Sequence, residues 1–145
     1  MTIKAFMKHP VITVRPHDSI RHAREVMEEH RINQLPVVVD GRLVGIVTDR
    51  DLRDAFPSVF EQLGARKRPR VKVADPAAIR VEDIMTSAIL TLPPDAPVED
   101  AARLLRKERI GALPIVGGGR LVGILTRSDV LDAFLARREP RAAAS

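Results

Sequence analysis

Residues 41–48 read Gly-Arg-Leu-Val-Gly-Ile-Val-Thr, and residues 119–126 read Gly-Arg-Leu-Val-Gly-Ile-Leu-Thr. The two stretches lie 78 positions apart in the chain. With the same shift, residues 7–56 match residues 85–134 at 20 of 50 positions without a gap. Agreement at this level over such a length indicates that the chain contains an internal duplication.

Each copy predicts a short strand, a helix, two strands and a second helix. The first helix of each copy shows apolar residues at helical spacing, and Asp18 is the expected N-cap in copy one. In copy two, Pro97 falls where a first helical turn tolerates proline. The apolar stripes are Ile20, Ala23, Val26 and Met27 in copy one, and Val98, Ala101, Leu104 and Leu105 in copy two.

The middle of each copy predicts a hairpin. Residues 35–39 and 43–47 are rich in β-branched side chains and flank Asp40-Gly41, a strong turn signal. In copy two the three glycines at 117–119 are expected to make the same reversal with a looser turn. The closing helices are predicted from about residue 49 to 56 and from 128 to 137.

These elements indicate a mixed α+β fold made of tandem β-α-β-β-α repeats. A repeat of about 50 residues buries too little surface to be stable alone, so we expect the copies to pack sheet to sheet about a pseudo-twofold axis. The predicted organisation is domain 1 at 1–62, a connector at 63–80, domain 2 at 81–138 and a flexible tail at 139–145.

Composition describes an ordinary globular protein, with 45% apolar and 30% charged residues and no cysteine. The absence of cysteine excludes disulfides and thiol catalysis and fits the cytoplasm, and we see no secretion signal or membrane span. The net charge is +5, and residues 57–80 carry 6 basic against 2 acidic side chains. Basicity is therefore concentrated in the connector.

The sharpest local motif is Thr-x-x-Asp at the start of each closing helix, directly after a buried strand. It has two interpretations. In the first, Thr48 with Asp51 and Thr126 with Asp129 form capping boxes that satisfy backbone N–H groups. In the second, the same helix start binds a phosphate and the carboxylate accepts ribose hydroxyls. Both copies keep the threonine and the aspartate while the residues between them change, which favours the second interpretation.

The order of these motifs resembles a cystathionine β-synthase-type (CBS) domain, present twice. The resemblance rests on Thr13-x-x-Pro16, then Ile32-x-x-Leu35-Pro36-Val37, then residues 41–51, and it recurs at 85–134. The chain is also similar to the CBS pair of acetoin-utilisation-type regulators. A CBS pair, or Bateman module, is a regulatory unit that holds up to two adenosine ligands in clefts between its copies.

The resemblance implies a set of ligand-binding residues. Asp51 and Asp129 would accept the ribose hydroxyls, and Thr48 and Thr126 would contact ribose or phosphate. Arg50 and Arg127 are candidates for the phosphates, although arginines at a helix start are often simply solvated. Adenine would lie against the segments entering the first strands and the Leu-Pro stretches. The remaining residues of the predicted site are Ile12, Thr13, Ile89, Leu90, Thr91, Gly45, Gly123, Asn33, Leu35, Pro36, Leu113 and Pro114.

The two predicted sites are expected to be unequal. Family members often carry a basic or polar residue shortly before the Leu-Pro proline, whereas here copy one has Asn33-Gln34 and copy two has Gly111-Ala112. The implied ligand is an adenine nucleotide or S-adenosylmethionine, with no cofactor and no metal. The implied role is a metabolite or energy sensor, not an enzyme, which forms a homodimer and signals to an effector protein.

Two other classes stay open on the residues alone. The connector places five cations within residues 66–72, which could bind nucleic acid or an acidic partner, or could be a solvated loop. Four phenylalanines are the only aromatic residues and fit core positions, so a stacking platform for nucleic acid is missing. An enzyme is disfavoured by the absence of a nucleophile motif or P-loop. A metal site is disfavoured because His9, His17, His22 and His30 do not share one helical face.

Overall fold

The computed structural model describes residues 1–55 and 78–138, which form two compact units. We call Ile12–Ile89 the repeat-1 unit, and Met1–Val11 together with the chain from Leu90 onward the repeat-2 unit. Helices and small antiparallel sheets confirm the predicted mixed α+β class. Residues 66–72 of the basic connector lie outside the described residues.

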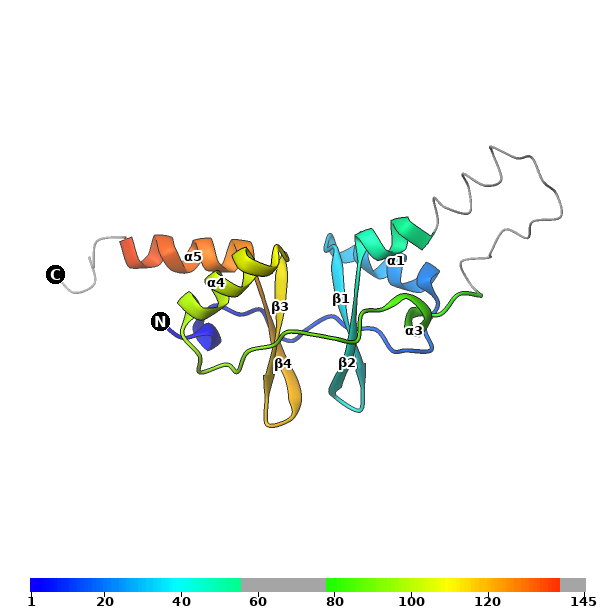
Figure 1. Ribbon diagram of the computed structural model, residues 1–145, viewed down its shortest axis with the longest axis horizontal. Helices are drawn as coiled ribbons and strands as arrows, with labels where there is room; N and C mark the ends of the chain where they lie inside the picture. The colour runs from blue at the N-terminus through cyan, green and yellow to red at the C-terminus, as the bar shows by residue number, and fades with distance from the viewer. Residues whose placement is uncertain (56–77, 139–145) are drawn as a thin grey trace. The chain divides into compact units, whose positions relative to one another are not determined.

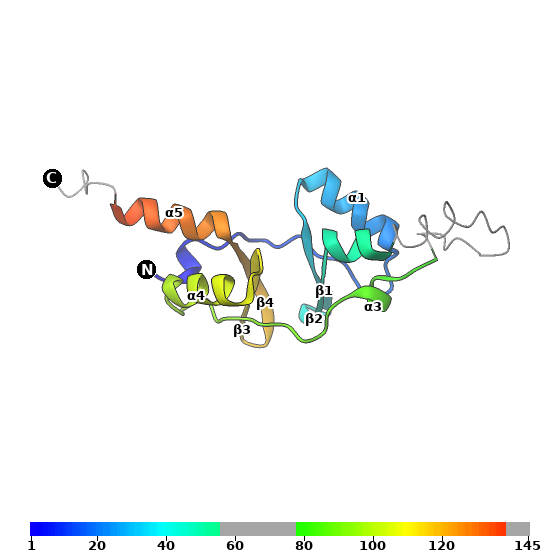
Figure 2. The same cartoon turned by 45° about the horizontal axis from the view of Figure 1, so that its top comes forward.

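The repeat-1 unit contains helix α1 (Ile20–His30), strands β1 (Gln34–Val39) and β2 (Arg42–Thr48), a helix described over residues 49–55, and the short helix α3 (Val81–Ile84). The repeat-2 unit contains the 3-10 turn η1 (Ile3–Ala5), α4 (Val98–Glu108), β3 (Ala112–Gly117), β4 (Arg120–Thr126) and α5 (Arg127–Arg138). Figures 1 and 2 show α1 beside the β1–β2 hairpin, and α4 and α5 beside the β3–β4 hairpin.

The predicted first strand of each repeat is shorter than expected. Val14 forms a single parallel bridge to Val37, and Leu92 forms the equivalent bridge to Ile115. The prolines that follow within two residues, Pro16 and Pro94, lack an N–H and do not extend the pairing. The predicted first strand therefore contributes only an isolated bridge to one edge of each hairpin.

Helix α1 begins one residue later than the sequence predicted. Its N-cap is Ser19, whose hydroxyl accepts the N–H of His22 at 3.0 Å. The prediction of Asp18 as N-cap was wrong, because the Asp18 carboxylate instead accepts the N–H of Arg15 at 2.8 Å and closes the preceding turn. The Ser19 hydroxyl thus satisfies an N–H of the first helical turn, and the Asp18 carboxylate satisfies an N–H of the turn before it.

The two hairpins have the same turn, which corrects the expectation of a looser one in copy two. Asp40 and Gly41 have φ values of 51° and 80°, and Gly118 and Gly119 have values of 60° and 77°. Positive φ at both central residues defines a two-residue turn whose twist matches the flanking strands. In each hairpin, further along the strands from the turn, the pairing register shifts by one residue. This shift indicates a β-bulge.

The compact units differ from the contiguous domains 1–62 and 81–138 because the repeats exchange their leading segments. Ile3 is buried in the core with α4 and β3, whereas its counterpart Val81 is buried in the core with α1 and β1. Both are fully inaccessible to solvent. Each leading segment therefore completes the hydrophobic core of the other repeat, a feature that local periodicity does not reveal.

Backbone hydrogen bonds fix the exchanged segments. Thr86 pairs with Ile46 of β2 through two bonds of 2.9 Å, and Lys8 pairs with Ile124 of β4 through bonds of 2.8 and 3.0 Å.

Among the helices that the structure describes, none is both long and apolar enough to cross a bilayer.

Candidate helix-start ligand sites

Both Thr-x-x-Asp motifs form reciprocal capping boxes. In the repeat-1 unit the Asp51 N–H donates to Thr48 Oγ1 at 3.1 Å, and the Thr48 N–H donates to Asp51 Oδ2 at 2.9 Å. In the repeat-2 unit the matching distances are 3.3 and 2.7 Å, and the Thr126 hydroxyl also donates to Asp129 Oδ2 at 2.9 Å. The capping interpretation therefore describes the geometry, and any ligand has to use the atoms that capping leaves available.

A second contact anchors each helix start. The N–H of Asp49 donates to the carbonyl of Asn33 at 2.8 Å, and the N–H of Arg127 donates to the carbonyl of Gly111 at 3.2 Å. Asn33 is thus tied through its backbone to the start of the helix that carries Asp51. Its side chain is exposed.

The two aspartates have different surroundings. Asp51 is half-buried, and among the described residues its Oδ1 accepts no hydrogen bond. Asp129 is 3% exposed, and its Oδ1 accepts a bond from the Lys8 ammonium while Oδ2 is taken by Thr126. One acid therefore presents an unused acceptor, and the other is paired with a cation.

Lys8 was missed by the sequence analysis, although the repeat alignment contained a signal. The residue that corresponds to Lys8 is Thr86, directly after the matched methionines Met7 and Met85. The alignment shows that these positions differ, but it places Lys8 in repeat 1. The exchange of leading segments is what brings its side chain to Asp129 of repeat 2.

The glycines of the predicted site have a packing role. A Cβ on Gly45 would lie 2.9 Å from Met85 Cγ and closer still to Sδ, and a Cβ on Gly123 would lie 2.8 Å from Met7 Cγ. These positions let the methionine of the exchanged segment cross the hairpin strand in close contact.

The two arginines predicted to bind phosphate are not equivalent. Arg50 is exposed at the start of its helix. Arg127 is also exposed, but its Nε donates to the carbonyl of Ile110 at 3.1 Å, which holds the side chain against its own unit.

The residues predicted around adenine divide into two groups. Leu90 and Thr91 are exposed, and Ile12, Thr13 and Ile89 are half-buried. The Leu-Pro pairs are fully enclosed in the unit cores, so their side chains offer no surface to a ligand in this structure; they are Leu35, Pro36, Leu113 and Pro114.

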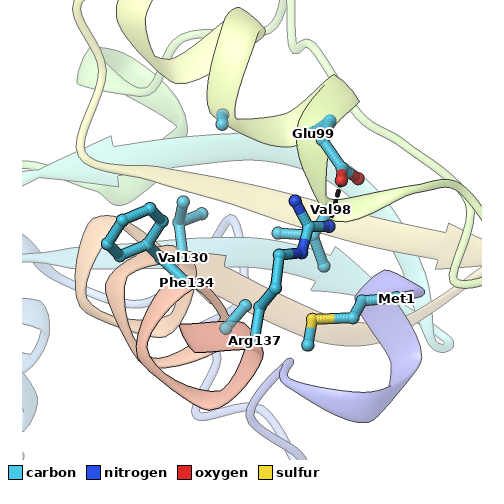
Figure 3. Close-up of a pocket in the computed structure, with 8 residues that line it drawn as sticks. Met1, Val98, Glu99, Val130, Phe134 and Arg137 are labelled. Carbon is cyan, nitrogen blue, oxygen red and sulfur yellow. Dashed lines mark hydrogen bonds and ion pairs between the residues drawn. The ribbon is translucent and has the colours of Figure 1, made fainter. Parts of the chain in front are cut away.

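A shallow apolar groove between α4 and α5 is separate from the predicted site residues (Figure 3). Val98, Val130 and Phe134 line it, and the Arg137 guanidinium bonds to Glu99 at its edge. This bond is the main reason that the pKa of Glu99 lies below its ordinary value of 4.5.

The described residues contain no cluster of three or more potential metal ligands.

The family model for the CBS domain matches residues 3–58 and 81–136. The chain belongs to the CBS domain family. The two matches confirm the tandem repeat and together cover most of the chain.

Relatives fall into two kinds. A CBS domain-containing protein of Dictyostelium discoideum is 36% identical over 140 residues, covering 95% of this chain and 94% of that protein. An inosine-5′-monophosphate dehydrogenase of Korarchaeum cryptofilum is 36% identical over 128 residues, which cover 88% of this chain but 23% of the enzyme. The match to this enzyme thus spans less than a quarter of its length.

Solved structures of CBS pairs show the same fold. The structure of CBSX2 in complex with AMP has a TM-score of 0.77 and 32% identity, covering 95% of this chain and 98% of that one. The CBS pair of MJ0100, in complex with 5′-methylthioadenosine and S-adenosyl-L-methionine, has a TM-score of 0.72 and 29% identity over the same shares. An acetoin utilization protein of Vibrio cholerae has a TM-score of 0.79 and 25% identity, covering 94% and 93%. These neighbours confirm the expected similarity to acetoin-utilisation-type CBS pairs.

Proposed function

We propose that this protein is a regulatory module that binds an adenosine-containing ligand at its helix starts and signals the bound state to a partner. The observation that carries the proposal is the Thr-x-x-Asp box at both helix starts in a CBS pair whose structural neighbours are named as complexes with AMP and S-adenosylmethionine. A non-catalytic role fits relatives that are themselves named as CBS domain-containing proteins. The cysteine-free composition supports a cytoplasmic location.

The Oδ1 oxygen of Asp51, which accepts no hydrogen bond from the described residues, supplies the chemistry for the first site. A carboxylate is an acceptor with two oxygens, and capping engages Oδ2 alone. A ribose hydroxyl can therefore donate to Oδ1 without opening the capping box. The helix N-terminus and the exposed Arg50 then favour an anionic group on the same ligand.

Titration calorimetry with AMP, ADP, ATP, S-adenosylmethionine and NADH tests the proposal. We expect at least one adenosine compound to bind the native protein, and Asp51→Ala and Asp129→Ala each to weaken one site. Asp132→Ala, an exposed acid on α5, is the matched control and should bind as the native chain does. Unchanged binding by the Asp51→Ala/Asp129→Ala variant would show that the ligand binds elsewhere.

A homodimer is the second part of the proposal. Helix α5 exposes three large apolar side chains, Leu131 at 61%, Phe134 at 55% and Leu135 at 55%, so the core position predicted for Phe134 was wrong. A contiguous apolar surface of this kind is typical of a protein–protein contact.

Light scattering after gel filtration measures the assembly. We expect a dimer for the native chain and a monomer for Leu131→Asp/Leu135→Asp, because an acid buried in an apolar interface loses its hydration. Val39→Asp makes the same type of change at another exposed site, on β1, and should stay dimeric. A native monomer, or an equal shift in both variants, would contradict this interface.

A further inference from the structure

The exchanged leading segments differ at the position that in the repeat-2 unit carries Lys8, the partner of Asp129. Lys8 is held beside β4 by its two backbone bonds to Ile124, and Thr86 is held beside β2 by its two bonds to Ile46. These positions correspond in the duplication. The backbones of Lys8 and Thr86 are fixed in the same way. At this position the two units therefore differ in the side chain alone, which is a cation in Lys8 and a neutral hydroxyl in Thr86.

The Lys8 ammonium occupies the oxygen of Asp129 that a ribose would need. Oδ2 of Asp129 already accepts two bonds from Thr126, and Oδ1 accepts the bond from Lys8. The Asp129 side chain is 4% exposed, whereas that of Lys8 is 60% exposed. The lysine therefore approaches the buried acid from the solvent side, where a ligand would arrive.

A ligand that binds to Asp129 either displaces the Lys8 ammonium from the carboxylate or binds beside it. In both cases the ligand has to offer the ammonium a favourable interaction. The 5′ substituent of adenosine is carried by the same ribose as the hydroxyls, so it comes near a flexible lysine that contacts the hydroxyl-binding acid. A phosphate at this position offers Lys8 a new anionic partner. A neutral 5′ group offers none, and the sulfonium of S-adenosylmethionine places a second positive charge near the first.

We propose that Lys8 gives the Asp129 site a selectivity for adenosine ligands with an anionic 5′ group beyond that of the helix start itself, whereas the Asp51 unit has the neutral Thr86 at this position and lacks that added selectivity. The inference rests on the proposed adenosine-binding function and assigns the specificity of one of its two sites. The opposite role, an ion pair that only holds the leading segment in place, predicts no effect on ligand choice.

Calorimetry with AMP, adenosine and S-adenosylmethionine separates the two roles. The Asp51→Ala background isolates the Asp129 site, and Lys8→Thr then installs the residue of the other repeat. We expect Lys8→Thr to weaken AMP binding by roughly tenfold, the size of one charge-assisted hydrogen bond, and to leave adenosine unchanged or tighter. S-adenosylmethionine should bind more tightly. Lys4→Thr removes an exposed lysine of the same leading segment and should change none of these affinities.

The reciprocal variant tests the same idea at the other site. In the Asp129→Ala background, Thr86→Lys should shift the Asp51 site toward AMP and away from S-adenosylmethionine. Thermal unfolding of each variant confirms that the protein tested is folded.

The outcomes distinguish this inference from the function on which it rests. An unchanged ratio of AMP to S-adenosylmethionine affinity after Lys8→Thr overturns the inference. Binding to the native chain that vanishes entirely in Asp51→Ala also overturns it, because the Asp129 site is then unused, while the proposed function stands. Failure of every adenosine compound to bind the native chain rejects both.

Discussion

The repeat-1 and repeat-2 units share their helix starts, hairpin turns and glycine–methionine contacts, yet they differ in what faces the helix-start acid. Asp51 keeps one oxygen without a hydrogen bond among the described residues, and Asp129 is paired with Lys8. The two copies thus keep the threonine and aspartate of the helix start and the glycine and methionine of the packing contact, but they differ at a residue on the exchanged segment. Because that segment packs on the other repeat, a change at position 8 in repeat 1 alters the site of repeat 2.

The largest expected effects on stability come from variants of the glycine–methionine contacts, which the two units share. Gly45→Ala and Gly123→Ala each place a methyl group against a methionine side chain that crosses the strand. Overpacking of this kind costs about 1–3 kcal/mol, so we expect similar losses of unfolding free energy in the two variants. Urea denaturation measures them, with ellipticity as the signal.

The methionines provide the control for that prediction. Met85→Ala should recover part of the loss in Gly45→Ala, and Met7→Ala should do the same for Gly123→Ala, because each removes the atoms that clash. A variant pair in which the added methyl costs nothing would show that the methionine moves aside freely and that the glycine is not required for packing.

The next largest effect on stability comes from variants of the helix-start aspartates, whose surroundings differ between the units. Asp129→Ala removes two bonds from Thr126 and the Lys8 pair from a buried position, so we expect a loss of roughly 1–3 kcal/mol. Asp51→Ala removes one capping bond from a half-buried position and should cost about 1 kcal/mol. Urea denaturation at neutral pH compares the two.

A double-mutant cycle assigns the difference. Lys8→Thr alone and combined with Asp129→Ala gives the coupling of the pair, which we expect at or below about 1 kcal/mol because Lys8 is mostly exposed. Equal losses for the two aspartate variants would mean that the cation and the deeper burial add nothing to stability.

The sequence predicted the elements of the fold well because the signals were local and present twice. Helical spacing, the Asp40-Gly41 turn and the Thr-x-x-Asp boxes each depend on residues close in the chain. The N-cap was misplaced because Asp18 and Ser19 are both good caps, and the choice depends on which of them closes the preceding turn. The tight turn at Gly118-Gly119 was missed because three glycines permit several loops, and strand pairing selects one.

The candidate site was predicted in part for the same reason. The threonine and aspartate of each box lie on one helix start, so spacing alone brings them together. Lys8 and Asp129 are 121 residues apart and meet through the exchange of leading segments, which has no local pattern in the chain. Burial of the Leu-Pro side chains also follows from tertiary packing, because a residue type does not specify which face of a strand the core covers.

The smallest expected effect concerns an ion pair on the surface of the repeat-2 unit. Glu99 of α4 is bonded by Arg137 of α5, whereas the position corresponding to Glu99 in repeat 1 is Arg21. The Arg137 bond lowers the pKa of Glu99 below 4.5, so the pair contributes stability above the pKa of an unfolded glutamate and loses it as pH falls through the lower folded value. Glu99→Gln should therefore have a slightly shallower loss of thermal stability than the native chain as the pH falls below 4.5. Glu108→Gln, an exposed glutamate at the other end of α4, is the control and should follow the native curve. Parallel curves for the native chain and Glu99→Gln throughout would show that solvent screens this pair completely, so that the hydrogen bond seen between the two side chains adds nothing to stability.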